Sequence, residues 1–383
     1  MASQTGLIQS YINTVPDKRM VTDRILMIEP YDIVAYAFLG TDMGKFNFAN
    51  REGKVYEWLE DTYTDRTDSV ATGMASSSTT TTATITTAAL FQPGDVWLIE
   101  SEKIWVSAIS GSVITMTRGY GDTNPATHAN STAMTRISRA RIDGDDADDS
   151  PSTEISSSSN YTQIFQRTVN IARTKENIAE YGVASWEDYW IDKYMEELMM
   201  DLARLPYHGE RVVGTASAAR MAGGLNTFIT DNLTYATSTG ATGGTASALT
   251  RDHIDDTLTN IHDDGGNPDL ILTTAHAQRK INDMYEGFVT TERSEQLGGV
   301  LIKKLMNPIT GKVLDVVVDR NAPAGEMWLL STPKIAYYPF DPFFYERLAK
   351  TGDAIKGQVV GEYGFVCAYD KSHGAVLEFS STL

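Results

Sequence analysis

The segment RGYGDTNPATHAN, residues 118–130, carries the side chains that most resemble a chemical site. Gly119 and Gly121 could let the backbone approach a phosphate, and His128 could act as an acid, a base or a ligand. The same residues also suit a turn between strands, because glycine permits tight turns and three more turn formers are present: Asp122, Asn124 and Pro125. Turn chemistry alone explains the segment. We therefore predict a structural role for Gly119, Gly121 and His128.

The acidic segment 143–160, DGDDADDSPSTEISSSSN, could be either a linker or a calcium loop. It has almost no apolar residue to place in a core, which favours a solvated linker. Three carboxylates stand at positions 1, 3 and 12 of a calcium loop, namely Asp143, Asp145 and Glu154. However, position 5 is Ala147, and position 6, where the sharp turn needs glycine, is Asp148. These two mismatches favour the linker.

Motifs for other chemistries are absent from the sequence. It has no GxGxxG after a strand, no GxSxG and no HExxH, and TGKV at 310–313 lacks the other residues of a phosphate loop. His253 and His262 stand nine residues apart on a predicted helix, so they do not converge on one metal ion. Cys367 lies in an apolar run, which predicts a buried structural thiol. We predict no catalysis, no cofactor and no metal.

Composition narrows the classes of function further. The chain has 383 residues, which is longer than most chains that fold around a single hydrophobic core. We therefore expect several domains or a large insertion. Its 32 basic and 50 acidic residues give a net charge of -18, which disfavours gripping nucleic acid but is compatible with surrounding it. No window approaches the roughly 18 apolar residues of a membrane span. One cysteine and a start without a leader pattern predict synthesis in a reducing cytoplasm.

The N-terminal half contains an arm, a β-rich module and one long helix. Residues 1 to about 30 have little periodic pattern and predict an arm. Residues 76–88 begin as a Ser/Thr tract and end with strand-like alternation. Three strands follow at a spacing that predicts a small barrel or sandwich: DVWLIES, EKIWVSAIS and SVITMTR. Ser185 and Asp188 approximate a capping box for a helix over 185–205, which Pro206 is expected to end.

The C-terminal half mixes helices and strands. A helix is predicted from Thr250 to Gly265 or Gly266, followed by the strand DLILTT and a helix through AHAQRKINDMY. One short helix, FFYERLAK, is predicted among the strands that follow: GGVLIKKLMN, KVLDVVVDR, EMWLLST, KIAYYPF, GQVVGEYGFVCAYD and AVLEFS. The predicted fold class is therefore α+β with one β insertion.

This order of elements resembles the major capsid proteins of tailed bacteriophages, which have the Hong Kong 97 fold, in the subfamily with a β-rich insertion in the E-loop. The segments that carry the resemblance are NYTQIFQRTVNIARTKENIAEYG, EDYWIDKYMEELMMDL, RMAGGLNTFI, GGNPDLILTTAHAQRKIN and ERLAKTGDAIKGQVVGEYGFVCAYDKSHGAVLEF. It implies five parts: an N-terminal arm at 1–45, an E-loop at 46–165 with its insertion at 76–140, a peripheral domain at 166–235 with a spine helix at 185–205, an axial domain at 236–340, and a return to the peripheral domain at 341–383.

The resemblance also implies a function and partners. The chain would self-assemble into pentamers and hexamers of an icosahedral phage head that encloses double-stranded DNA, in the virion, after synthesis in the bacterial cytoplasm. Its partners would be other copies, a portal, scaffolding proteins and, in some heads, decoration proteins, with no membrane. Because the chain begins near the arm, we expect any scaffold to be a separate protein, and no residues match the isopeptide cross-link of some relatives. The candidate subunit contacts are Trp58, Trp186, Trp190, Arg347, Lys350 and Glu362.

Two alternatives remain open from the sequence. A carbohydrate-binding or adhesive surface protein would use the Trp, Tyr and Thr content of residues 90–140, and exposure of Trp97 and Trp105 would favour it. Burial of these two side chains would favour a packed insertion instead. The second alternative is a cellular nanocompartment shell of the same fold, which the large E-loop insertion disfavours.

Overall fold

The computed structural model describes residues 33–41, 45–46, 53–75, 81–144, 154–178, 183–285, 289–291 and 303–381. The chain divides into two compact units. The main unit consists of Met1–Trp58 and Ser158–Leu383, and the insertion unit consists of Leu59–Ser157. Most of the expected arm at 1–45, and Asp145 of the expected calcium loop, lie outside the described residues.

The helices of the described residues differ widely in length. They are α1 (Val34–Leu39), α2 (Arg173–Asn177), α3 (Trp186–His208), α4 (Leu225–Phe228), α5 (Arg251–Asp263) and α6 (Ala275–Met284), with three short 3-10 turns at Ala88–Leu90, Thr332–Lys334 and Asp370–Ser372. None of these helices is both long enough and apolar enough to cross a membrane.

The larger sheet of the main unit has seven strands in the order β10-β18-β15-β11-β14-β13-β12. The pairs β10–β18 and β11–β14 are parallel, and the other neighbours are antiparallel. The strands are β10 (Leu233–Tyr235), β11 (Leu270–Thr273), β12 (Val289–Thr291), β13 (Lys303–Met306), β14 (Val313–Val318), β15 (Met327–Leu330) and β18 (Gly374–Leu377).

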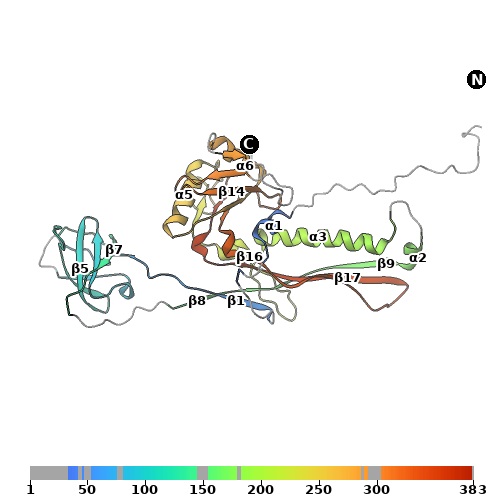
Figure 1. Ribbon diagram of the computed structural model, residues 1–383, viewed down its shortest axis with the longest axis horizontal. Helices are drawn as coiled ribbons and strands as arrows, with labels where there is room; N and C mark the ends of the chain where they lie inside the picture. The colour runs from blue at the N-terminus through green and yellow to red at the C-terminus, as the bar shows by residue number, and fades with distance from the viewer. Residues whose placement is uncertain are drawn as a thin grey trace, which may run out of the picture. The chain divides into compact units, whose positions relative to one another are not determined.

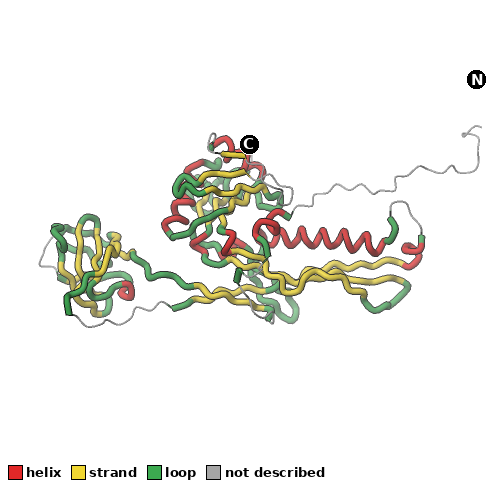
Figure 2. The backbone as a smooth tube through the Cα atoms, in the orientation of Figure 1, coloured by secondary structure: helices red, strands yellow, loops and turns green. Residues whose placement is uncertain are grey.

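Both faces of this sheet are buried. Successive side chains of a strand point to opposite faces, so Leu270 and Leu272 of β11 enter one core and Ile271 enters another. The first core also contains the C-terminal half of α3, and the second lies beneath α5 and α6. Figure 2 shows these helices in red around the yellow strands. The near-continuous apolar run of β11, LILT, reflects this burial on both sides.

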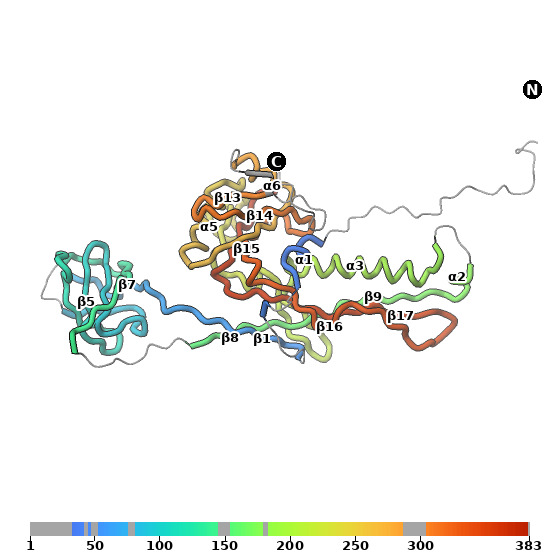
Figure 3. Tube along the Cα trace, in the orientation of Figure 1, coloured from blue at the N-terminus to red at the C-terminus, as the bar shows by residue number. Residues whose placement is uncertain are grey.

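The second sheet of the main unit has three antiparallel strands in the order β16-β17-β9. They are β9 (Gln163–Ala172), β16 (Ile335–Arg347) and β17 (Ala354–Cys367). Helix α3 runs alongside this sheet in Figure 1. Figure 3 shows the green β9 beside the red β17, two segments from opposite halves of the chain.

The insertion unit contains a six-stranded antiparallel sheet in the order β2-β7-β4-β5-β6-β3. The strands are β2 (Thr67–Ser69), β3 (Thr82–Thr84), β4 (Asp95–Ile99), β5 (Glu102–Ser110), β6 (Val113–Thr117) and β7 (Ala133–Arg139). The residues that follow the two edge strands, Val70 and Ile85, form an antiparallel bridge. This bridge closes the sheet into a small barrel around a core that includes Trp97, Ile104 and Ile114.

Several predicted elements are confirmed. The three strands of the β-rich module are β4, β5 and β6. Helix α5 begins after Thr250, whose hydroxyl forms a capping box with His253, and it is followed by β11 and α6 as expected. Ser185 caps α3 by accepting a hydrogen bond from the Asp188 amide at 3.2 Å. Cys367 is buried, as predicted.

Three local predictions are wrong. Pro206 does not end the long helix, which continues to His208, because Pro206 is buried with Leu205 and Tyr207 near the end of the helix. The segment FFYERLAK is not a helix: through Arg347 it is the end of β16, held by pairing with Val360 and Gly357 of β17. The end of the predicted linker forms β8 (Ser156–Tyr161), which pairs with β1 (Val55–Glu60). Tertiary pairing overrides weak local propensity in the last two cases.

His373 is a buried hydrogen-bonding node near β15 and β18. Its Nδ1 accepts from the Ser331 amide at 3.1 Å, and its Nε2 lies 3.1 Å from the Ala368 carbonyl. An imidazole that accepts on one nitrogen and donates from the other is neutral. Burial lowers the pKa of His373 from the ordinary 6.5 to about 4. Folding therefore disfavours protonation of this side chain.

This node predicts a pH dependence of stability. As the pH falls below 6.5, the unfolded chain binds a proton at His373 before the folded chain does, so stability is complete above pH 6.5 and is lost as the pH approaches about 4. When the pH falls from about 7.5 to about 5.5, we expect the free energy of unfolding to decrease by about 1 kcal/mol because of this residue. Urea unfolding of the wild type and His373→Gln at both pH values measures it. Equal pH dependence in the two proteins would contradict the prediction.

Candidate subunit-contact surfaces

The glycine-rich segment 118–130 lies around a buried carboxylate, that of Glu102 in β5. Arg118 donates to it twice, from Nε to Oε1 at 2.9 Å and from Nη2 to Oε2 at 2.6 Å. The amides of Gly119 and Ala126 donate to the same carboxylate at 3.1 and 3.0 Å. His128 Nε2 lies 2.9 Å from Glu102 Oε2. The carboxylate thus organises the segment from inside the protein.

The charges in this network are compensated. Burial alone would raise the pKa of Glu102, but the hydrogen bonds from Arg118, Ala126 and His128 lower it to about 2. The other ring nitrogen of His128 lies 3.0 Å from Glu100, whose side chain is largely exposed. Gly119 and Gly121 both have positive φ, as the turn requires. The geometry agrees with the predicted structural role of the segment.

The two tryptophans that distinguish an adhesive surface protein from a packed insertion both make contacts within the insertion unit. Trp97 is fully buried and stacks on Phe91 with ring centroids 4.1 Å apart. Trp105 is half-buried, and its Nε1 donates to the Ala140 carbonyl at 2.8 Å. Carbohydrate-binding tryptophans need an exposed face, so this packing favours a structural insertion.

The first half of α3 has an aromatic face that its own chain covers only partly. Trp186, Tyr189, Trp190 and Tyr194 follow one another in ring contacts of 5.2 to 5.7 Å, and all are half-buried. Lys175 lies 4.5 Å from the ring centre of Trp186, and Lys193 lies 4.8 Å from that of Trp190. In contrast, the second half of the helix is buried through Leu198, Leu202 and Leu205. Two of the predicted contact residues, Trp186 and Trp190, thus lie on the partly covered half.

Arg347 ties β16 to the start of α3. Its Nε donates to Glu187 Oε1 at 2.6 Å, and its Nη2 donates to the other oxygen of the same buried carboxylate. Tyr345 adds a third hydrogen bond at 2.6 Å. The hydrogen bond from Arg347 lowers the pKa of Glu187. Lys350, also a predicted contact, is exposed and lies 3.9 Å from Asp353.

Glu362 takes part in an ion pair within its own chain. It accepts hydrogen bonds from Arg220 and from the Thr162 hydroxyl, and Arg220 Nε also donates to the Thr162 carbonyl at 2.7 Å. Trp58 is likewise packed within the chain, 5.3 Å from Phe228 in an edge-to-face contact. The structure therefore brings Arg347 to α3, whereas Trp58 packs on Phe228 and Glu362 pairs with Arg220.

Two buried polar residues that the sequence analysis did not single out connect β1 and β8 to β17. The hydroxyl of Tyr56 donates to the Phe365 carbonyl at 2.9 Å and accepts from the Phe365 amide at 2.6 Å. Asn160 Nδ2 donates to the carbonyls of Phe365 and Gly223, and its Oδ1 accepts from the amides of Gly223 and Tyr161. The amide group of Asn160 thus uses both of its donors and its acceptor.

Within the described ranges, no three ligand side chains converge on a point that could hold a metal ion. Asp143 and Glu154 of the expected calcium loop are both exposed, and neither belongs to such a group. The polar clusters above are carboxylates paired with arginine, which suits structural support rather than metal binding.

Comparisons with known proteins point to one family. The model of the family described as SU10 major capsid protein matches residues 4–380 of this chain. No curated protein sequence matches it.

Several solved structures are similar to this chain at low sequence identity. The capsid of cyanophage A-1(L) is 14% identical, covers 98% of this chain and 100% of its own, and has a TM-score of 0.54. The capsid of Myoviridae phage XM1 is 10% identical, with coverages of 98% and 100% and a TM-score of 0.50. The SrpI encapsulin of Synechococcus elongatus PCC 7942 is 9% identical and covers 60% of this chain and 79% of its own, with a TM-score of 0.44.

The Glu102 network predicts that Glu102 contributes much more to stability than the neighbouring Glu100 does. Glu102→Gln leaves Arg118 buried without its counter-charge, which we expect to destabilise the insertion unit by about 3 to 5 kcal/mol. Glu100→Gln removes an exposed partner of His128 and should cost less than about 1 kcal/mol. Amide hydrogen exchange of β4, β5 and β6 in the full chain measures both. Similar exchange in the two variants would contradict the prediction.

In the main unit, we likewise expect a change at the buried Asn160 to lower stability more than the same change at an exposed asparagine. In Asn160→Asp, an oxygen replaces the donor that faces the carbonyls of Phe365 and Gly223, and we expect a loss of about 3 kcal/mol of stability. Asn226→Asp is the matched control, because the side chain of Asn226 is exposed and makes one bond, to the Tyr207 carbonyl at 3.2 Å. Urea unfolding of both variants tests the contrast, and equal stabilities would count against it.

Proposed function

This chain belongs to the SU10 major capsid protein family and has the Hong Kong 97 capsid fold, and from that premise we propose that its copies form the pentamers and hexamers of an icosahedral phage head. The resemblance found in the sequence is confirmed, and the chain is a structural capsid protein. The observation that carries the conclusion is the family match over residues 4–380, nearly the whole chain. The head would enclose double-stranded DNA.

We assign the expected domains to the two sheets of the main unit. The peripheral domain would comprise α3 with the β16-β17-β9 sheet, and the axial domain the seven-stranded sheet with α5 and α6. On this assignment, three of the expected boundaries differ. Strand β10 (Leu233–Tyr235) goes to the axial domain, β16 goes to the peripheral domain from Ile335 onward, and the return to the peripheral domain at 341–383 does not include β18. Strand β18 pairs with β10 and β15 in the seven-stranded sheet, so we assign Gly374–Leu377 to the axial domain. The insertion unit would be the β-rich module of the E-loop.

Surface chemistry supports assembly through local contacts. The net charge of -18 makes distant copies repel one another, so stable association requires apolar contacts at close range. The half-covered rings of Trp186, Tyr189 and Trp190 supply apolar area of this kind. Rings of five and six copies arise when one surface meets a different surface. Several modest contacts per subunit then reinforce one another through effective concentration.

The proposed contact residues fall into two groups. Trp186, Trp190 and Lys350 are at least partly accessible, and Arg347 is 67% exposed at its side chain despite its bond to Glu187. These four would face neighbouring copies directly. Trp58 and Glu362 pack within the chain, so they would act by holding the surfaces that neighbours meet.

The role places the chain in the virion and needs no catalysis. The acidic charge suits a wall that does not adhere to packaged DNA. Other partners would be a portal, scaffolding proteins and, where a head has them, decoration proteins, assembled in the bacterial cytoplasm. The adhesive alternative loses its main support, because Trp97 is buried and Trp105 is hydrogen-bonded within the insertion unit.

Particle size of the purified chain tests the proposed function. We expect light scattering and negative-stain electron microscopy to find closed shells, tubes or rings of five or six copies, with or without the scaffolding protein. Trp186→Ala with Trp190→Ala should reduce assembly, because the apolar area between copies is lost, while the subunit stays folded. Tyr120→Ala is the matched control, since this half-exposed ring belongs to the insertion unit.

The outcomes separate clearly. Wild-type chains that remain monomers or dimers even with their scaffold would overturn the proposed function. Normal particles from the double tryptophan variant would leave the function standing but remove the aromatic face of α3 from the contacts. Circular dichroism of the soluble variant distinguishes lost assembly from lost folding.

A further inference from the structure

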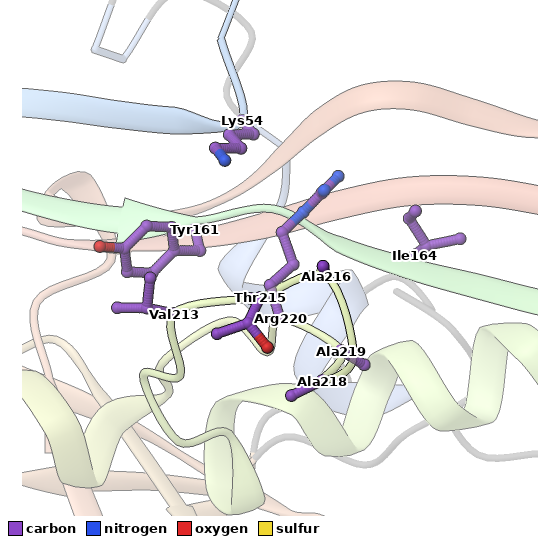
Figure 4. A pocket seen from close by; sticks show the side chains of 10 residues that line it. Lys54, Tyr161, Ile164, Val213, Thr215, Ala216, Ala218, Ala219 and Arg220 are labelled. Carbon is purple, nitrogen blue, oxygen red and sulfur yellow. The ribbon is translucent and has the colours of Figure 1, made fainter.

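A groove lies on the main unit where β8 passes into β9, beside the loop that follows α3. Its cavity of about 450 Å³ is lined by Lys54, Tyr161, Ile164, Arg220 and the small residues of the loop, from Val213 to Ala219. In Figure 4, Lys54 and Tyr161 lie on the side of the strands, and the side chain of Arg220 extends from the loop toward the strands. The volume lies in the range of sites that hold a small organic molecule.

One buried residue, Thr162, contacts both cationic residues of the groove. Its amide donates to the Lys54 carbonyl at 3.0 Å, and its own carbonyl accepts from Arg220 Nε at 2.7 Å. Arg220 also donates from Nη2 to Glu362, so its guanidinium is held by two partners. Lys54 precedes β1 and Arg220 ends the loop after α3, so folding brings together two cations that are distant in the sequence.

Both cations keep hydrogen-bond donors that the described part of the chain does not use. Neither Arg220 Nη1 nor the ammonium group of Lys54 has a hydrogen bond to another described residue. Glu362 offsets one of the two positive charges, so the lining stays positive on a chain whose net charge is -18. A guanidinium held in one direction and an ammonium on a flexible stem are the usual partners of phosphate oxygens. The charged side of the groove therefore suits a phosphate group.

The rest of the lining suits a flat apolar group. Ile164 is 52% exposed and Val213 is 60% exposed, so both offer apolar surface that the main unit does not cover. The ring of Tyr161 also lines the cavity, and the guanidinium of Arg211 lies 5.5 Å from the ring centre. An aromatic ring of this kind stacks on nucleic-acid bases without regard to their sequence. The ligand that uses the whole groove thus has a phosphate group at one end and a flat ring at the other.

We propose that this groove binds a nucleotide, with its monoester phosphate at Lys54 and Arg220 and its base against Tyr161 and Val213. A free nucleotide and the 5′-phosphorylated end of a single strand share this chemistry. The interior of a duplex offers neither a monoester phosphate nor an unstacked base, which agrees with an acidic surface that does not grip double-stranded DNA. The site goes beyond the proposed function and does not depend on it, because every residue named lies in one chain.

Equilibrium dialysis of the purified full chain tests the site with three probes: dAMP, deoxyadenosine and inorganic phosphate. We expect dAMP to bind at least about tenfold more tightly than either of its parts, because the two linked contacts act together. A short single strand of deoxyadenosine nucleotides tests the second source. It should bind when it carries a 5′-phosphate and should lose most of its affinity when that phosphate is removed.

Two variants separate the two halves of the site. Lys54→Gln should weaken the binding of both dAMP and inorganic phosphate by about tenfold, because it removes a charged donor. Tyr161→Leu should weaken dAMP by about fivefold or more and leave inorganic phosphate unchanged, because only the base contacts the ring. Lys312→Gln is the matched control: Lys312 is an exposed lysine of the same unit, and its substitution changes the net charge equally. Circular dichroism checks that each variant is folded.

The contrary outcomes are equally distinct. Binding of dAMP no tighter than that of inorganic phosphate would overturn the nucleotide assignment. Equal loss of binding in Lys54→Gln and Lys312→Gln would show an effect of net charge alone and would overturn the site. A single strand that binds equally well without its 5′-phosphate would contradict the role of the monoester. Particle formation is measured separately, so failure of the site leaves the proposed function standing.

Discussion

Strand β17 is the constraint on which the main unit depends, because it is hydrogen-bonded on both edges and contacted by large rings on its surface. It pairs with β16 on one side and with β9 on the other. A Cβ at Gly364 would overlap Tyr56, and one at Gly357 would overlap Tyr345. These glycines let the rings lie directly against the strand. Tyr56 then reaches Phe365 and fixes β1, whereas Tyr345 reaches Glu187 and fixes α3.

The same pattern of support recurs in both units: a buried or partly buried carboxylate is matched by one arginine from another element of the chain. Glu102 meets Arg118, Glu187 meets Arg347, and Glu362 meets Arg220. Such pairs add little net stability over apolar packing, but losing one partner leaves a charge that burial penalises. They therefore specify which elements lie together. The first pair attaches the 118–130 segment to β5, the second attaches α3 to β16, and the third attaches the loop that contains Arg220 to β17.

The sequence predicted elements whose signals are local and missed those that depend on distant partners. The helix start at Thr250, the strands β4 to β6 and the burial of Cys367 follow from nearby residues, and all are confirmed. Residues 343–347 were predicted as a helix because only β17, which follows them in the chain, makes them a strand. Asn160 lies in a serine-rich stretch that resembles a linker, and its importance comes from Phe365 and Gly223. Nothing in the local sequence signals either partner.

The charge of the chain explains why contacts between copies must be short and specific. Net repulsion between acidic subunits extends over about a Debye length, roughly 8 Å at physiological salt, and so opposes association before surfaces touch. Three arginines are already paired with carboxylates of their own chain, so they do little to offset this repulsion. Half-buried rings such as Trp190 act only at contact distance. Screening by salt should therefore favour assembly overall, even though it weakens each local charge pair.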